Sequence, residues 1–206
     1  MAVAAVAAAM QFASPASATP VLTFDEATGT RTNSSQSVGW QFDVLSAITA
    51  TGLGWYDQGQ DGLSDSHTVG IWDSSGTLLT SILVPAGSTA GLDGVYRAVP
   101  IAPLLLPVGT GYIVGGEDFF ESEDGLAFNV TQVTIPQISY FDATFSGGVS
   151  GFLRPTDFSI ANTGFYGPMF FVGANPAGAP EPATLALFGF GLLGLAVIRR
   201  RRKANA

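Results

Sequence analysis

The segment Val38-Gly39-Trp40-Gln41-Phe42-Asp43-Val44 decides the fold class of this chain. Its large apolar residues recur at every second position, and side chains two residues apart lie on the same face of a β-strand. Segments 48–56, 78–84 and 138–145 have similar apolar and β-prone character. Shorter or less regular runs of this kind predict further strands at 69–71, 95–101, 112–114, 126–135, 158–160 and 169–172.

Glycine-containing pairs that favour turns separate these runs: Asp61-Gly62, Ser75-Gly76, Asp93-Gly94, Asp124-Gly125 and Gly147-Gly148. No stretch before residue 183 shows the periodicity of an amphipathic helix. Many short strands at this spacing predict an all-β domain over 19–175. We expect a single antiparallel β-sandwich of the jelly-roll kind, with a barrel as the alternative.

Charge and cysteine content exclude several classes of function. The chain has 8 basic and 16 acidic residues, and five of the basic residues lie together at 199–203. Without that cluster and Glu181, 3 basic and 15 acidic residues remain, a formal charge of −12 for the body. Such a surface repels phosphates, so we expect no nucleic-acid partner. The absence of cysteine excludes disulfides, thiolate metal sites and cysteine nucleophiles.

The N-terminal residues 1–18 have the composition of a signal peptide. A run of small apolar residues leads to Ala16-Ser17-Ala18, a small-x-small site at which signal peptidase would cut after Ala18. No Lys or Arg precedes the apolar run, so we expect the true start codon to lie upstream. The alternative is an alanine-rich helix, which Pro15 would end early.

The C-terminal residues 176–206 carry the most specific pattern. Pro180-Glu181-Pro182 precedes the uncharged segment 183–198, which is almost wholly apolar, and a basic cluster follows it. As a helix, 183–198 spans roughly 24 Å, enough to cross a bilayer when flanking arginines extend to the interface. The basic cluster, which should stay in the cytoplasm and so place the body outside, comprises Arg199, Arg200, Arg201, Arg202 and Lys203.

This order of features resembles the PEP-CTERM sorting signal of exported bacterial proteins. The resemblance implies recognition by an exosortase, cleavage near Pro180-Glu181-Pro182, and a transient stage in the inner membrane. It also implies delivery to the cell surface or medium of a Gram-negative bacterium that makes extracellular polysaccharide and biofilm. The alternative is a tail anchor that is never processed. Gly189-Phe190-Gly191-Leu192-Leu193-Gly194 matches the G-x-G-x-x-G pattern of dinucleotide-binding sites. It lacks the preceding strand and the acidic residue about 20 positions later that such a site requires.

Part of the body also resembles a family. Residues 38–115 contain Val38-Gly39-Trp40-Gln41-Phe42, Leu53-Gly54-Trp55-Tyr56-Asp57, Asp61-Gly62-Leu63-Ser64-Asp65-Ser66-His67 and Val69-Gly70-Ile71-Trp72-Asp73. They are similar to an uncharacterised β-rich domain of exported bacterial proteins. The family has no known activity that the resemblance could transfer to this chain.

His67 is the only histidine in the chain. Ser64, Ser66, Asp65 and Asp73 lie near it in sequence, but neighbours on one loop rarely form a catalytic triad, and no Gly-x-Ser-x-Gly elbow is present. We therefore expect His67 to anchor the loop before the strand at 69–71 by a hydrogen bond. We assign no catalytic residue.

Two acidic clusters are candidate cation sites, because calcium prefers carboxylate and carbonyl oxygens. Asp57, Asp61 and Asp65 surround the Gly62 turn and form the first candidate calcium site. The second cluster is Glu117, Asp118, Glu121, Glu123 and Asp124. The alternative for both is a solvated acidic loop, in which case the protein has no cofactor.

The tryptophans Trp40, Trp55 and Trp72 could stack on sugars if exposed, although burial between sheets is commoner for this residue. The leading interpretation is a non-enzymatic surface or matrix protein, sorted by exosortase and associated with extracellular polysaccharide. One alternative is a calcium-dependent carbohydrate-binding module. The other is a glycoside hydrolase that uses paired carboxylates, such as Asp61 and Asp124.

Overall fold

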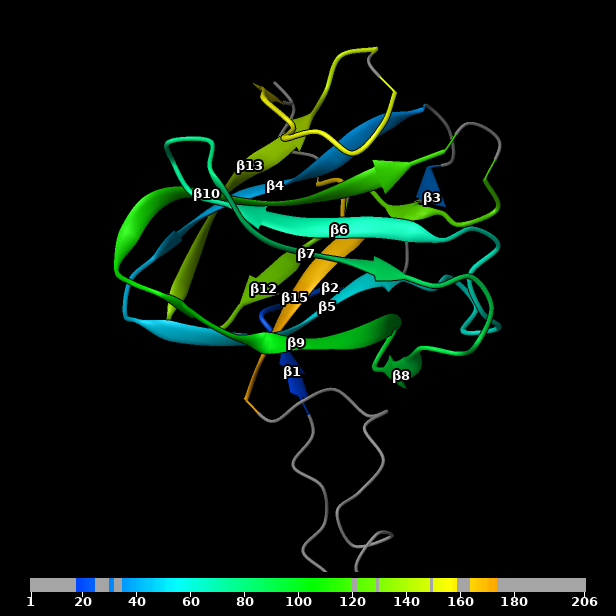
Figure 1. Ribbon diagram of the computed structural model, residues 1–206, viewed down its shortest axis with the longest axis horizontal. Helices are drawn as coiled ribbons and strands as arrows, with labels where there is room; N and C mark the ends of the chain where they lie inside the picture. The colour runs from blue at the N-terminus through cyan, green and yellow to red at the C-terminus, as the bar shows by residue number, and fades with distance from the viewer. Residues whose placement is uncertain are drawn as a thin grey trace, which may run out of the picture.

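The computed structural model describes residues 18–24, 30–31, 35–119, 122–128, 130–148, 150–158 and 164–173, and these contain strands but no helix (Figure 1). The prediction of an all-β domain is confirmed. The strands are β1 (Ala18–Pro20), β2 (Leu22–Phe24), β3 (Thr30–Arg31), β4 (Gln36–Val44), β5 (Ile48–Tyr56), β6 (His67–Trp72), β7 (Leu78–Val84), β8 (Gly91–Asp93), β9 (Tyr96–Leu106), β10 (Gly109–Asp118), β11 (Leu126–Ala127), β12 (Gln132–Thr134), β13 (Ile138–Phe145), β14 (Asp157–Phe158) and β15 (Pro168–Gly173).

Two antiparallel sheets make up the sandwich. One has the order β1-β15-β5-β9-β8 and the other the order β14-β13-β4-β10-β6-β7, with the small pairs β11-β3 and β12-β2 beside them. The predicted strands 48–56, 78–84 and 138–145 match β5, β7 and β13 at both ends. The predicted run 126–135 is two separate strands, β11 and β12, which pair with β3 and β2.

One apolar core lies between the sheets. Trp40 and Phe42, two apart on β4, are both fully buried, as their alternation predicts. Both rings stack on Phe170 of β15 in the facing sheet, with ring centres 6.0 and 4.9 Å away. These contacts across the sheets show that the alternating pattern of β4 fills the core and fixes its register.

A row of glycines crosses the six-stranded sheet. Gly39 of β4 and Gly70 of β6 both pair with Gly115 of β10. A Cβ atom at Gly115 would lie 2.9 Å from Pro155, and one at Gly70 would lie 2.7 Å from Phe152. The row therefore forms a flat strip on which the segment containing Phe152 and Pro155 packs closely.

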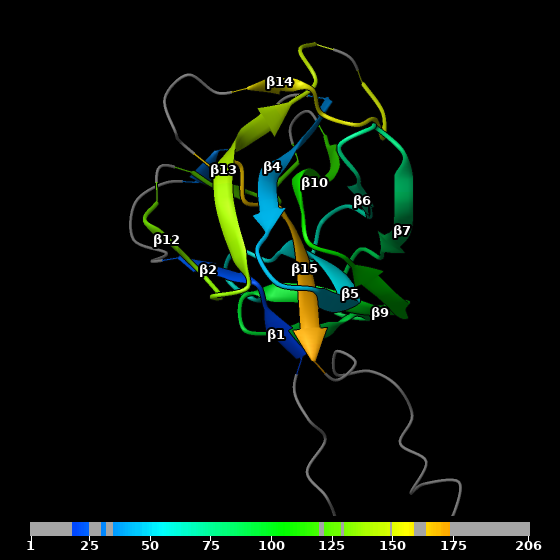
Figure 2. The ribbon, with the colours of Figure 1, turned by 90° about the vertical axis from the view of Figure 1, so that its left-hand side faces the viewer.

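The first and last described strands are neighbours. β1 pairs with β15 so that Ala18 lies opposite Gly173, and both strands therefore meet the rest of the chain at one end of the sandwich (Figure 2). The predicted signal peptide 1–18, apart from Ala18, and the sorting residues Pro180, Glu181 and Pro182 lie outside the described residues. The same holds for the predicted membrane helix 183–198 and the basic cluster. Within the described ranges no helix is long and apolar enough to cross a membrane.

Candidate functional site

A buried polar cluster surrounds His67 at the start of β6. The ring is fully buried. Its Nδ1 lies 2.8 Å from the backbone oxygen of Glu117, and its Nε2 lies 2.8 Å from Oδ2 of Asp124. Each contact therefore uses one of the two ring nitrogens, and both partner atoms are oxygens. One face of the ring stacks on Trp55, with ring centres 4.0 Å apart and planes 4° from parallel.

Asp124 joins two loops through this cluster. Its carboxylate accepts hydrogen bonds from the backbone N–H groups of Ser64 and Asp65, at 2.8 and 2.9 Å, as well as from His67. Burial raises the pKa of Asp124, but the hydrogen bonds from His67 and from these two N–H groups outweigh it, so the net pKa is lowered. Asp124 therefore stays a carboxylate and holds the loop before β6 against the segment 122–125.

This geometry leaves His67 no free nitrogen for general-base catalysis. A serine nucleophile would have to bond a ring nitrogen, and both nitrogens already bond other groups. The Ser66 hydroxyl instead accepts from the backbone N–H of Ala86 at 2.9 Å. His67 thus anchors its loop, as expected from the sequence, and the anchoring partner is Asp124, 57 residues away.

A buried ion pair fixes Asp57. Nε of Arg97 donates to Oδ2 of Asp57 at 2.6 Å, and both side chains are almost wholly buried. The backbone N–H of Gly62 also donates to this carboxylate, at 3.1 Å to Oδ2. Gly62 has a φ of 112°, a conformation that glycine adopts without strain. Arg97 further bonds the backbone oxygens of Gln60 and Ala90, so the pair ties the 57–62 turn to β9.

The three carboxylates of the candidate calcium site are therefore in different surroundings. Asp57 is buried against Arg97, Asp61 is exposed, and Asp65 is half-buried and donates its backbone N–H to Asp124. No three His, Asp or Glu side chains within the described ranges are close enough together to hold a metal ion. Calcium binding at Asp57, Asp61 and Asp65 stays a prediction, but this geometry does not favour it, since the Asp57 carboxylate already has a cationic partner.

The second acidic cluster is also divided. Asp118 and Asp124 are buried, Glu117 is half-buried and Glu123 is exposed, whereas Glu121 lies outside the described residues. Asp124, one carboxylate of the glycoside hydrolase alternative, is the partner of His67. Nothing in this placement favours hydrolysis over a structural role.

All three tryptophans are buried, so none is available to stack on a sugar. Trp55 lies in a slot that glycines make possible. A Cβ atom at Gly116 or Gly167 would come within 2.7 Å of its indole ring. Trp72 packs on Phe152, with ring centres 5.1 Å apart.

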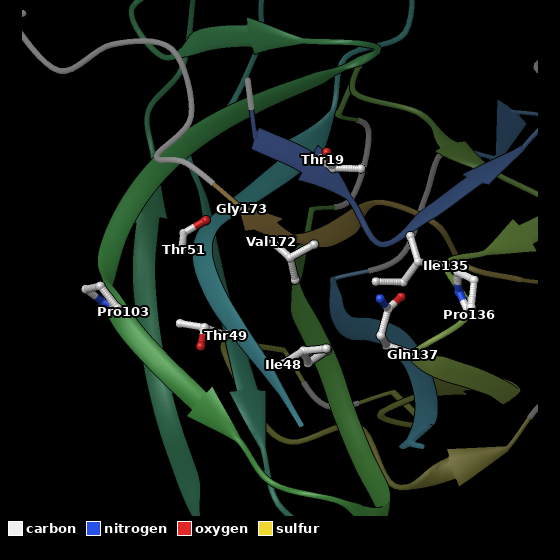
Figure 3. Close-up of a pocket in the computed structure, with 10 residues that line it drawn as sticks. All are labelled: Thr19, Ile48, Thr49, Thr51, Pro103, Ile135, Pro136, Gln137, Val172 and Gly173. Carbon is white, nitrogen blue, oxygen red and sulfur yellow. The ribbon is translucent and has the colours of Figure 1, made fainter. Parts of the chain in front are cut away.

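An open hollow of about 590 Å³ lies at the end of the sandwich where β15 ends (Figure 3). No acidic or basic side chain lines it, so it offers no group for acid–base chemistry. Sequence reasoning did not single out these residues, because they come from β1, β5, β9, β15 and the 135–137 turn. The lining residues are Thr19, Ile48, Thr49, Thr51, Pro103, Ile135, Pro136, Gln137, Val172 and Gly173.

The residues of the family-like segment 61–73 thus have structural roles in the fold. Gly62 bonds Asp57, Leu63 bridges to Gly87, His67 anchors its loop, and Gly70 lies in the glycine row. Comparison with known families agrees that this is a domain motif: residues 23–165 match a domain of unknown function, DUF4082. The chain belongs to the DUF4082 family. No curated protein and no solved structure matches it.

The tail of this DUF4082 protein matches the PEP-CTERM protein-sorting motif over residues 179–202. The resemblance expected from Pro180 to Lys203 is confirmed. The chain is therefore an exported protein that is anchored in a membrane and processed by an exosortase. The last described strand of the domain ends at Gly173, seven positions before Pro180.

Proposed function

We propose that this chain is a non-enzymatic module of the cell surface or extracellular matrix, which contacts extracellular polysaccharide after sorting. We place it in a Gram-negative bacterium that forms biofilm, after signal peptidase has removed residues 1–18. The observation that carries the polysaccharide contact is a pair of exposed phenylalanine rings on neighbouring strands.

These rings belong to Phe141 of β13 and Phe158 of β14, which are 59% and 45% exposed. Their centres are 6.2 Å apart and their planes meet at 79°, an edge-to-face pair. The pairing of β13 with β4 shifts between Tyr140 and Asp142. Phe141 faces solvent while Tyr140 packs against the core, because successive side chains of a strand point to opposite faces.

Exposed ring faces with polar neighbours suit sugars, because the negative face of a ring attracts the C–H groups of a pyranose. Asp142 and Asp157 flank the two rings in sequence, and each uses one oxygen to accept a backbone N–H. The remaining carboxylate oxygen of each side chain can accept a hydrogen bond from a sugar hydroxyl. The pair is thus a small apolar surface with hydrogen-bond acceptors beside it.

The proposed lack of catalysis is supported by the contacts of four buried polar or charged side chains. His67, Asp124, Asp57 and Arg97 bond one another or the backbone, and such contacts stabilise loops rather than activate a nucleophile. The lining of the hollow of Figure 3 has no titratable side chain. Neither observation favours the calcium-dependent module or the glycoside hydrolase.

The test is co-sedimentation of the released protein with extracellular polysaccharide purified from the producing strain. We expect binding that falls at least about tenfold when Phe141 and Phe158 are both changed to Ser, as for other central aromatic contacts. The matched control is Leu45→Ser, since Leu45 is similarly exposed, at 57%, but lies outside the ring pair. Undiminished binding by the double variant, or no binding by the unchanged protein, would reject the proposal.

A further inference from the structure

We propose that the outer edge of β7 pairs with β7 of a second copy of this chain, so that two sandwiches form a twofold dimer. β7 is the last strand of the six-stranded sheet, and among the described strands it pairs with β6 alone. Figures 1 and 2 show it at the margin of the sheet, beyond β6. An edge strand directs every second pair of backbone N–H and C=O groups outward, where another strand can bond them.

The edge is regular over most of its length. β7 pairs with β6 without a shift from Thr80, opposite Ile71, to Val84, opposite His67. The only irregularity lies beyond Thr80, toward Leu78. A bulge within an edge strand twists it away from a partner, and the segment Thr80–Val84 has none.

The side chains of β7 also lack the usual protection of an edge. Natural edge strands are commonly protected by Lys, Pro or inward-pointing charges. β7 reads Leu-Leu-Thr-Ser-Ile-Leu-Val, and no charged residue occurs anywhere from 74 to 92. Leu83 is 55% exposed. This sequence has the high β-propensity, low charge and lack of proline that favour pairing between strands.

The charge distribution favours β7 over the acidic surfaces of the body for a contact between two copies. The body has a formal charge of −12, so most ways of bringing two copies together place acidic groups near one another. Pairing at β7 joins two segments in which residues 74–92 carry no charge. Copies held by their sorting tails in the same membrane would also have a raised effective concentration.

The pairing has a definite geometry. A twofold axis at Ile82 places Ser81 of one copy opposite Leu83 of the other. Both residues are exposed, whereas Thr80, Ile82 and Val84 are partly or fully buried. The exposed and buried faces of the two strands therefore continue across the junction, as the period of two requires. Because β7 is used by both copies, the dimer is closed.

The test is sedimentation equilibrium of the protein as the cell releases it, with Leu83→Lys as the edge variant. We expect a monomer–dimer equilibrium for the unchanged protein and a dissociation constant at least about tenfold higher for Leu83→Lys, since lysine opposes strand addition. The matched control, Val133→Lys, alters a 66%-exposed residue of β12, on the other side of the molecule (Figure 2). It should dimerise as the unchanged protein does. Higher salt should strengthen dimerisation by screening the acidic bodies.

A cysteine cross-link tests the register. The chain has no cysteine, so an oxidised mixture of Ser81→Cys and Leu83→Cys should form a disulfide between the two variants in preference to either alone. The unchanged protein remaining monomeric up to about 200 µM, a concentration that excludes all but very weak association, would overturn the proposal. So would a dimer that Leu83→Lys leaves intact. Near-ultraviolet circular dichroism of each variant shows whether its fold is retained.

Discussion

Nε2 of His67 lies 2.8 Å from Oδ2 of Asp124, and this contact joins the loop before β6 to the segment that follows β10. The two side chains are 0% and 6% exposed. A buried pair of this kind leaves an uncompensated polar group when one partner changes.

We expect Asp124→Asn to lower the free energy of unfolding by about 3 kcal/mol or more, because His67 loses its charged partner in a buried site. Urea denaturation of the released protein measures this. The control is Glu123→Gln, which removes an exposed neighbouring carboxylate and should change stability by less than about 0.5 kcal/mol. Equal effects of the two substitutions would contradict the structural role assigned to Asp124.

Acid should destabilise the domain through Asp124 and Asp73. Burial alone raises the pKa of Asp124, but its hydrogen bonds bring it below the ordinary value of 3.8. The pKa of Asp73 is lowered first by the Ser75 hydroxyl and then by the Thr77 N–H. A lowered folded pKa means that the unfolded chain binds more protons, so stability is present above about pH 3.8 and is lost as pH falls through the folded pKa.

Denaturation between pH 2.5 and 6 measures this acid dependence. Its slope below pH 4 should be smaller in Asp124→Asn than in the unchanged protein, because the variant lacks one of the two carboxylates. An identical slope in both proteins would show that Asp124 does not contribute to it.

Much of the fold follows from local pattern. β5, β7 and β13 could be predicted at both ends because their apolar and β-prone residues run the full length of each strand. β1, β2 and β3 have two or three residues each and are too short for any period to be visible. They exist because a distant strand bonds them, which a single sequence does not show.

The partners of the buried polar side chains were harder to predict from sequence than the strands. The role of His67 as a loop anchor could be predicted from its place before a strand, but its partner is 57 residues away. The closeness of Asp57 to Asp61 and Asp65 in sequence predicts a cation ligand, whereas the partner that the structure gives Asp57, Arg97, is 40 residues away. Local spacing groups carboxylates that the fold separates, since strand pairing rather than sequence distance decides which side chains meet.

Calcium should not stabilise the domain, because Asp57 is already paired with Arg97. Differential scanning calorimetry with calcium and with a chelator tests this. Saturation of a real site would raise the melting temperature by about 5 °C or more, and we expect no such rise. A saturable rise that disappears in Asp61→Asn would restore the calcium hypothesis.

Gly116→Ala should destabilise the domain by about 1–3 kcal/mol, a typical cost of overpacking. The new methyl group would lie 2.7 Å from the Trp55 ring and 2.9 Å from the backbone oxygen of Thr68. Gly109→Ala in the same strand is the control, because its nearest contact is a Tyr112 side-chain atom at 3.3 Å. Thermal denaturation compares the two, and equal stabilities would mean that the Trp55 slot is not tight.

The most direct test of the whole account is intact mass and cell fractionation of the protein from strains with and without exosortase. With exosortase, we predict a chain that begins at Thr19, ends near Pro180-Glu181-Pro182 and leaves the inner membrane with its domain folded through Gly173. Without exosortase, the tail should stay attached and the protein should stay in the membrane. A full-length tail in the membrane of both strains would contradict sorting, and with it delivery of the domain to the surface.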